Sequence, residues 1–294
     1  MNTFLVTGAS GFLGNAVARK LAAAGRVVRA GFRHAEDRLD LREPDTVRRL
    51  LASGQPDVVI HAAAYRDPDF CEEHPDETRR LNVEPVRLLA SELPTGARLV
   101  LISSDYVFDG ESPPYREDSA RHPLSLYGHS KAEAEDMALA RPGTLVVRIP
   151  LLIGIEPSHR GPSGFVLQIA RQVLDGKPAK VDDLLVRFPT WTEDVAEAVA
   201  FLLAKKAEGI FHVSAPRGAT RYAWTLETAR ILSQSADHLT PSKAFVPRAA
   251  RRPMNTELAT GKLQALGFNR FTDFTTVAER ILRDGKTQNP PDHS

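Results

Sequence analysis

The glycine-rich stretch at residues 7–14 limits what this chain can fold into more than any other segment. Residues 2–7 are apolar and β-prone, Gly8, Gly11 and Gly14 follow at once, and an amphipathic helical pattern continues beyond them. A turn between a strand and a helix lets a pyrophosphate lie against backbone N–H groups at the positive helix end. Gly8 would form the turn, Gly11 would allow close backbone approach, and Gly14 would let the helix pack on the sheet. The stretch predicts a dinucleotide site; the alternative is a plain turn whose glycines serve only steric needs.

Strand and helix patterns alternate through the first half of the chain. Apolar strand patterns at 27–32, 57–61, 99–102 and 144–149 are separated by helical patterns at about 45–53, 76–93 and 127–140. Five β–α units with right-handed crossovers predict an α/β fold, a Rossmann-type doubly wound parallel sheet over residues 1–150.

Beyond Pro150 the regular alternation lapses. Residues 151–284 predict a smaller α+β substrate lobe, with some segments returning to the first domain. Within it we expect helices at 164–175, 193–205 and 222–235 and strands near 179–186 and 210–214. Residues 285–294 are polar and contain proline, so we expect a disordered tail.

The composition excludes several classes of protein. With 38 Lys+Arg against 37 Asp+Glu, the chain offers no electrostatic reason to bind nucleic acid or an acidic membrane. A single cysteine, Cys71, excludes an intramolecular disulfide and fits a reducing compartment. No apolar run approaches the roughly 18 residues that a membrane span needs, and no basic leader precedes the first strand. We therefore expect a cytoplasmic protein, and we predict no metal site.

Tyr127 and Lys131 form the candidate acid/base pair. They are four residues apart at the start of a helical pattern, so their side chains share one face. An ammonium beside a phenol favours the phenolate, so we expect the pKa of Tyr127 to fall from about 10 toward neutral pH. Tyr127 would then exchange a proton with a substrate oxygen. Ser103 and Ser104 close the strand pattern at 99–102, where ligands of open α/β sheets bind, and one of these hydroxyls is expected to hold the same oxygen.

Cations follow the second predicted strand. Arg33 and His34 stand where an NAD site would carry an acidic residue, and a cation there suits a 2′-phosphate. We therefore expect NADP(H), with NAD(H) as the alternative. Asp40, followed by Leu41, would accept from the adenine amine or be a solvated turn residue.

Four further features are interpreted from their positions in the sequence. The small residues Ala62, Ala63 and Ala64 follow the third strand and leave room for a cofactor ribose. We expect His61 to be a packed or backbone-bonded histidine, and Asn82, in an otherwise apolar helical stripe, to bind the backbone of a neighbouring strand. The arginines at 248–252 reach a substrate phosphate or belong to a solvated loop.

Several motifs, in order, resemble the extended short-chain dehydrogenases/reductases. TGASGFLG at 7–14 has their G-x-x-G-x-x-G spacing, and HAAAYRDPDF at 61–70, SSDYVFDG at 103–110 and YGHSK at 127–131 follow. Within them the chain resembles the dTDP-4-dehydrorhamnose reductase family, through PTWTEDVAEAV at 189–199 and RRPMNTELATGKLQALG at 251–267.

This resemblance implies a site and a reaction. Ser104, rather than Ser103, takes the catalytic place with Tyr127 and Lys131. The expected reaction is NADPH-dependent reduction of a 4-keto-6-deoxy sugar nucleotide. The cofactor-binding residues then comprise Gly8, Ser10, Gly11, Phe12, Leu13, Gly14, Arg33, Asp40, Leu41, Ala62, Ala63, Ala64, Tyr127 and Lys131. In the dehydratases of the superfamily an Asp-Glu pair follows the strand hydroxyl, whereas here Asp105 is followed by Tyr106, which disfavours elimination.

A second resemblance is to the regulatory β subunits of methionine adenosyltransferase. It is carried by GFRH at 31–34, DYVFDGESPPYRE at 105–117, VVRIPLLIG at 146–154 and VRFPTWTEDVA at 186–196. It implies an NADP-binding partner of an adenosyltransferase catalytic subunit with little or no turnover of its own, where the first resemblance is compatible with a homodimer. Arg148-Ile149-Pro150-Leu151 also stands where rhamnose-pathway reductases usually carry Arg-Thr-Ser-Trp, which leaves the sugar open.

Overall fold

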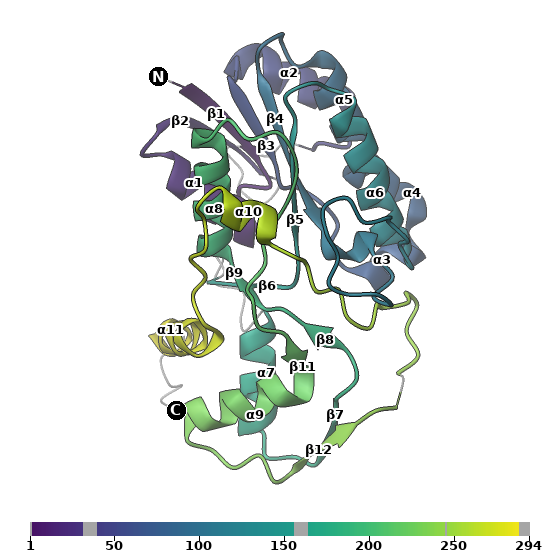
Figure 1. The fold of residues 1–294 in the computed structure, drawn as a ribbon, viewed down its shortest axis with the longest axis vertical. Coiled ribbons are helices and arrows are strands. Elements are labelled where there is room, and N and C mark those ends of the chain that lie inside the picture. The colour runs from purple at the N-terminus through teal and green to yellow at the C-terminus, as the bar shows by residue number, and fades with distance from the viewer. Residues whose placement is uncertain (1, 32–39, 156–163, 245, 288–294) are drawn as a thin grey trace, which may run out of the picture.

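A parallel sheet forms the centre of the molecule. The computed structural model describes residues 2–31, 40–155, 164–244 and 246–287. Within these ranges six strands form one sheet in the order β10-β5-β4-β3-β1-β2, and all neighbours are parallel (Figure 1). The strands are β1 (Asn2–Thr7), β2 (Gly25–Ala30), β3 (Val58–His61), β4 (Arg98–Ser104), β5 (Leu145–Ile149) and β10 (Gly209–His212). The predicted doubly wound α/β fold is confirmed, and its edge strand β10 comes from beyond residue 150.

Helices cover both faces of the sheet. On one face lie α1 (Phe12–Leu21) and α8 (Thr192–Ala204), and on the other α2 (Pro44–Gly54), α5 (Glu84–Glu92) and α6 (Leu126–Leu139) (Figure 1). Successive side chains of a strand point to opposite faces, so Phe4 and Val6 pack against α1 while Leu5 packs on the other side. Because both faces are buried, the inner strands are largely apolar runs rather than alternating ones, whereas the edge strand β2 carries Arg26 and Arg29.

The helix predicted at 76–93 is two helices. α4 (Pro75–Asn82) ends at Val83, whose φ is −116°, and α5 begins at the next residue. Pro85 lacks the N–H that would bond to the carbonyl of Leu81, and its ring crowds that carbonyl, so the continuous helix breaks there. A short unpredicted helix, α3 (Pro68–Glu73), precedes them.

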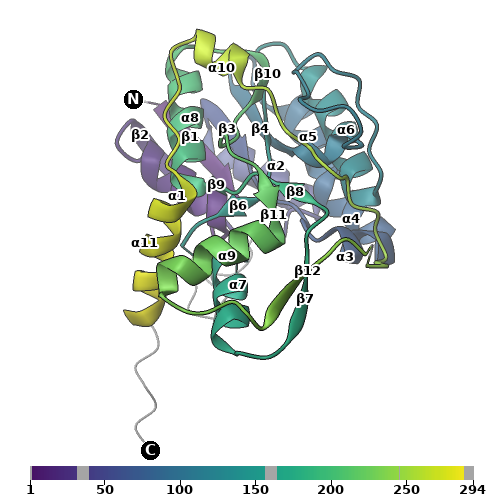
Figure 2. The ribbon, with the colours of Figure 1, turned by 60° about the horizontal axis from the view of Figure 1, so that its bottom comes forward.

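The second lobe packs three helices around Trp224. These are α7 (Phe165–Leu174), α9 (Arg221–Leu232) and α11 (Phe274–Thr287). Three two-stranded pairs join it: β7 (Ala179–Asp182) with β12 (Leu239–Ser242), β8 (Val186–Arg187) with β11 (Ala219–Thr220), and β6 (Leu152–Ile153) with β9 (Thr190–Trp191) (Figure 2). The strand expected at 179–186 is therefore two short strands. Residues 285–287 belong to α11, so the prediction of a disordered tail is wrong for them, and residues 288–294 lie outside the described residues.

One segment, residues 250–259, connects the second lobe back to the sheet domain, and we call it the strap. It follows β12 and leads to α10 (Gly261–Ala265), which packs beside β10 (Figures 1 and 2). Isolated bridges pair Leu258 with Tyr115 and Asn255 with Val186, so the strap contacts both lobes. None of the helices in the described part of the chain is long and apolar enough to cross a bilayer.

Candidate active site

The glycine turn is built as tightly as its sequence predicts. Gly8 has a φ of +67°, and a Cβ added there would lie 2.8 Å from the backbone nitrogen of Ala63. A Cβ on Gly14 would lie 2.2 Å from the Gly8 carbonyl oxygen, so only glycine lets α1 pack on the turn. At Gly11 a Cβ would meet, among the described residues, just that carbonyl at 3.2 Å.

The open side of the turn fits a pyrophosphate. Gly11 is the N-cap of α1, and no described side chain caps the N–H groups of the first helical turn. These groups and the positive helix end are the donors that an anion needs. The predicted neighbours differ in role: Leu13 is buried in the core, Ser10 lies against Gly31, and Phe12 is half-buried with the Arg66 guanidinium 5.7 Å from its ring centroid.

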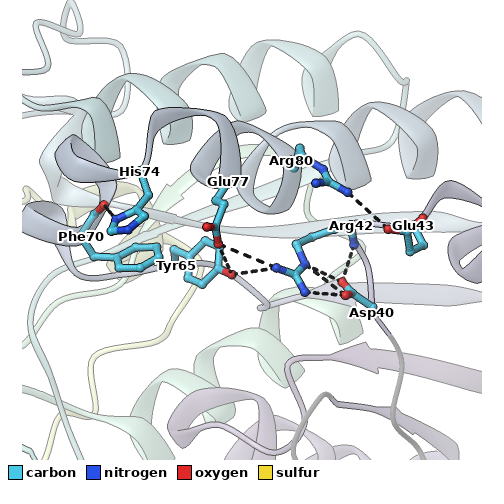
Figure 3. Close-up of polar contacts among 8 residues, drawn as sticks. All are labelled: Asp40, Arg42, Glu43, Tyr65, Phe70, His74, Glu77 and Arg80. Carbon is cyan, nitrogen blue, oxygen red and sulfur yellow. Dashed lines mark hydrogen bonds and ion pairs between the residues drawn. The ribbon is translucent and has the colours of Figure 1, made fainter.

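At the end of the site expected to take the adenosine, Asp40 is held by an arginine that the sequence analysis missed. The Asp40 carboxylate accepts from Arg42 Nε at 2.9 Å and Arg42 Nη2 at 2.6 Å (Figure 3). This hydrogen bond is the main reason why the pKa of Asp40 lies below its usual value. The Leu41 side chain is buried in the core. Arg33 falls in 32–39, outside the described residues.

Arg42 extends this cluster to the residue that follows the three alanines. Its Nη1 lies 3.4 Å from the Tyr65 hydroxyl and 3.8 Å from the Glu77 carboxylate (Figure 3). The Tyr65 ring contacts Phe70, with 4.7 Å between centroids, and Phe70 stacks on His74. The sequence feature that could have indicated this cluster is an arginine two residues after Asp40, within the same turn.

The candidate acid/base pair lies in the first two turns of α6. Ser125 caps the helix by accepting from the Gly128 N–H at 3.2 Å, and Glu72 of α3 accepts from the Leu126 N–H at 2.8 Å. Tyr127 and Lys131 follow on adjacent turns, as their spacing predicts. The helix start is thereby fixed both locally and by a neighbouring element.

The electrostatics of the pair differ from the expectation. Lys131 is buried and its Nζ donates to the Ile102 carbonyl at 2.6 Å; burial lowers its pKa to about 8 despite the Glu135 carboxylate. The pKa of Tyr127 is raised, because burial outweighs its hydrogen bond with the Ser104 hydroxyl. The predicted fall in the pKa of Tyr127 is therefore wrong for this state: the ammonium is directed at a strand carbonyl while the phenol is desolvated. Tyr127 is protonated at neutral pH.

The two strand serines have different partners. Ser104 donates to the Asp105 carboxylate at 3.0 Å and lies beside Tyr127. Ser103 faces the opposite way and donates to Glu135 at 2.5 Å. Adjacent residues of a strand point to opposite faces, so Ser104 alone is positioned to act with Tyr127.

A buried ion cluster anchors α6 beneath the site. Glu135 accepts from Arg148 of β5 in a bidentate pair, at 2.9 and 2.8 Å, and from Arg121 at 3.1 Å. Arg148 also lies 3.4 Å from His212, whose pKa burial and this cation lower to about 3. Arg148 is thus turned toward the helix, a role that sequence spacing alone did not indicate.

Asn82 and His61, the two polar residues predicted to have structural roles, are both buried. Asn82 accepts from the Tyr65 N–H at 2.8 Å and donates to the Tyr65 carbonyl at 3.0 Å, so it binds backbone as predicted, but that of the loop after β3 rather than of the strand. His61 Nδ1 lies 3.0 Å from the Thr7 hydroxyl, and burial, with Lys131 second, lowers its pKa to about 3. His61 is accordingly a packed, neutral histidine.

The arginines at 248–252 do not act as one group. Arg252 is nearly buried and pairs with Asp69 of α3 at 2.8 Å, so it joins the strap to the sheet domain. Arg248 is exposed and lies close enough to Arg221 for its charge to lower the pKa of that residue, after burial.

Comparison with known proteins shows to which family this chain belongs. Residues 1–286 match the family described as the RmlD substrate binding domain. The chain belongs to this family. The methionine adenosyltransferase 2 β subunit of Bos taurus is 36% identical to it over 281 residues, covering 92% of this chain and 84% of the relative. The probable dTDP-4,6-dihydroxy-2-methyloxan-3-one 4-ketoreductase of Streptomyces antibioticus is 33% identical over 287 residues, covering 96% and 95%.

Solved structures agree. A dTDP-4-dehydrorhamnose reductase from Clostridium acetobutylicum superposes with a TM-score of 0.85 at 28% identity, covering 96% of this chain and 98% of the other. As a member of the RmlD family with this fold, the chain is an oxidoreductase of the short-chain dehydrogenase/reductase type.

Proposed function

We propose that this chain is an NADPH-dependent reductase of a 4-keto-6-deoxy sugar nucleotide. The supporting observation is that the Ser104 hydroxyl lies beside the Tyr127 phenol at the carboxyl edge of the sheet, the edge that also carries the glycine turn, while Lys131 follows Tyr127 by one helical turn with its Nζ on the Ile102 carbonyl. Relatives named as reductases of keto sugar nucleotides support the substrate class.

The residues divide the chemistry as follows. When bound, the reduced nicotinamide supplies a hydride to the keto carbon. Tyr127 donates its proton to the keto oxygen, and its high pKa at rest keeps that proton available at neutral pH. Ser104 holds the same oxygen. Lys131 binds the nicotinamide ribose and stabilises the phenolate that Tyr127 becomes.

Other residues would hold the two ligands. The backbone of Gly8, Gly11 and Gly14 takes the pyrophosphate, and Arg33 and His34 favour the 2′-phosphate of NADP over NAD. On the substrate side, Arg221 is half-buried, lies over the Phe165 ring at 5.5 Å, and has no carboxylate hydrogen bond among the described residues. With Arg248 beside it, this cation suits the diphosphate of a sugar nucleotide.

The test is NADPH consumption with a panel of 4-keto-6-deoxy sugar nucleotides. Tyr127→Phe should reduce kcat at least about 100-fold, the usual contribution of a positioned proton donor. Tyr222→Phe is the matched control, because that ring packs in a separate apolar cluster of the second lobe. Turnover that survives Tyr127→Phe, or its absence with every panel member, would refute the proposal. Repeating the panel with NADH decides the cofactor.

A second candidate is a regulatory subunit that binds NADP and turns over little or nothing. It is favoured by the 36% identity to methionine adenosyltransferase 2 β subunits and by Arg148-Ile149-Pro150-Leu151 in place of the tryptophan-containing motif. Isolation from its own cells should then yield a stoichiometric complex with an adenosyltransferase catalytic subunit. A free homodimer with rapid turnover would exclude this alternative.

A further inference from the structure

Two buried residues beside the candidate site have no role in the proposed chemistry. Asp105 follows Ser104 and is 3% exposed, and Thr256 is 1% exposed. The two oxygens of the Asp105 carboxylate accept from different hydroxyls, Oδ1 from Ser104 at 3.0 Å and Oδ2 from Thr256. A buried carboxylate is costly unless its oxygens are hydrogen-bonded, so both contacts matter to the folded state.

Thr256 reaches Asp105 from 151 residues along the chain, because it lies in the strap. The strap is fastened on either side of Thr256. Toward its start, Ala250 N and the Arg252 guanidinium both bind Asp69, at 2.9 and 2.8 Å. Backbone hydrogen bonds also join Val186 N to Met254 O at 2.9 Å, Tyr115 N to Glu257 O at 2.8 Å and Ala259 N to Tyr115 O at 2.7 Å. Hydrogen bonds therefore hold the strap in place both before and after Thr256.

Which group donates in each of these hydrogen bonds decides whether Ser104 can donate to a substrate oxygen. A carboxylate only accepts, so Ser104 donates its single hydroxyl proton to Asp105 in this arrangement and accepts from the Tyr106 N–H at 3.2 Å. The Asp105 carboxylate and the Tyr127 phenol oxygen, whose pKa a hydrogen bond from Ser104 lowers, therefore compete for one proton. To hold a substrate oxygen, Ser104 must redirect that proton. How strongly Asp105 competes for the proton depends on its other donors, of which Thr256 is one.

We infer that Asp105 and Thr256 are positioning residues, through which the seating of the strap sets the direction of the Ser104 hydroxyl proton. The inference rests on the proposed function for its catalytic consequence. With Thr256 in place, Asp105 is partly satisfied and yields the Ser104 proton to a substrate oxygen. Without the Thr256 hydroxyl, Asp105 holds Ser104 more tightly.

Other groups face Asp105 and enter the same balance. Arg187 of β8 lowers its pKa, as do the hydroxyls of Thr256 and Ser104, but burial outweighs them and the net shift is upward. The Asp105 charge in turn raises the pKa of Tyr106 and Tyr127. Removing Thr256 should therefore raise the pKa of Asp105 further.

The test follows the Asp105 carboxyl carbon by ¹³C NMR titration, assigned with Asp105→Asn. Thr256→Val should raise the pKa of Asp105 by about one pH unit, the size expected for one lost hydrogen bond, and Thr256→Ser should restore it. Ser104→Ala should raise the same pKa. These measurements need no turnover, so they decide the contacts even if the proposed function fails.

The catalytic consequence is read separately with the keto sugar nucleotide. Thr256→Val should lower kcat about tenfold and leave KM for NADPH unchanged, and Thr256→Ser should retain most of the activity. The inference is overturned by an unchanged Asp105 titration in Thr256→Val, by Thr256→Ser behaving like Thr256→Val, or by a shifted titration with unaltered kcat in an active enzyme.

Discussion

Lys131 should destabilise the fold that it serves, and replacing it with methionine should stabilise that fold at neutral pH. Its pKa falls from 10.5 to about 8 on burial, and the side chain is nearly inaccessible, so solvent does not screen the effect. Linkage converts this difference into about 3 kcal/mol of lost stability at pH 7. Lys131→Met also removes the hydrogen bond to the Ile102 carbonyl, which costs about 1 kcal/mol, so the expected net gain is about 2 kcal/mol.

The pH dependence separates charge from packing. Between pH 8 and 10.5 the unfolded chain keeps a proton that folded Lys131 has released, so wild-type stability rises with pH in this window. At pH 10 the penalty has shrunk to about 1 kcal/mol, and the advantage of Lys131→Met should vanish. Urea unfolding at pH 7 and pH 10 measures both differences. Lys131→Arg, which cannot lose its proton, should be less stable than wild type at either pH.

The reasoning fails if Lys131→Met is equally stabilising, or equally destabilising, at both pH values. That result would mean that the ammonium is hydrated in the folded protein and that side-chain packing alone separates the variants. NADPH-dependent turnover of Lys131→Met should be lost in any case. The same substitution thus measures how much folding stability the protein loses by keeping a buried ammonium at the candidate site.

Three other outcomes are expected. Gly14→Ala should destabilise the protein by at least about 2 kcal/mol, since its Cβ would lie 2.2 Å from a backbone oxygen, whereas Gly261→Ala, with nothing described within 4 Å, should be neutral in the same thermal melt. Ser104→Ala should lower kcat with little loss of stability, and Ser103→Ala should do the reverse because it removes one of the donors to the buried Glu135 carboxylate; equal effects of the two on kcat would contradict their assignment. The kcat/KM should fall above about pH 8 as Lys131 loses its proton, and a flat profile to pH 9.5 would count against its role.

Local sequence patterns determined much of the fold. The inner strands are largely apolar because both sheet faces are covered. The order of strand, glycine turn and helix at the N-terminus predicts a tight turn, and a Cβ on Gly8 or Gly14 would indeed meet the backbone. The positions of Tyr127 and Lys131 on adjacent turns of α6 followed from their spacing, while their assignment as an acid/base pair also drew on the glycine turn and the family resemblance. What spacing missed was the break at Val83, where Pro85 overrides an apolar stripe that otherwise continues.

The chemical state of the site was decided by tertiary structure. Sequence placed an ammonium beside a phenol, but the fold directs Lys131 at a strand carbonyl and buries Tyr127, so the pKa of that phenol rises instead of falling. Likewise, nothing local indicates that Thr256 would meet Asp105. Burial and long-range contacts have no signature in neighbouring residues, because they depend on which distant segments the folded chain brings together. The sequence by itself thus predicted the candidate residues of the site, and packing determines their burial, their hydrogen-bond partners and the direction of their pKa shifts.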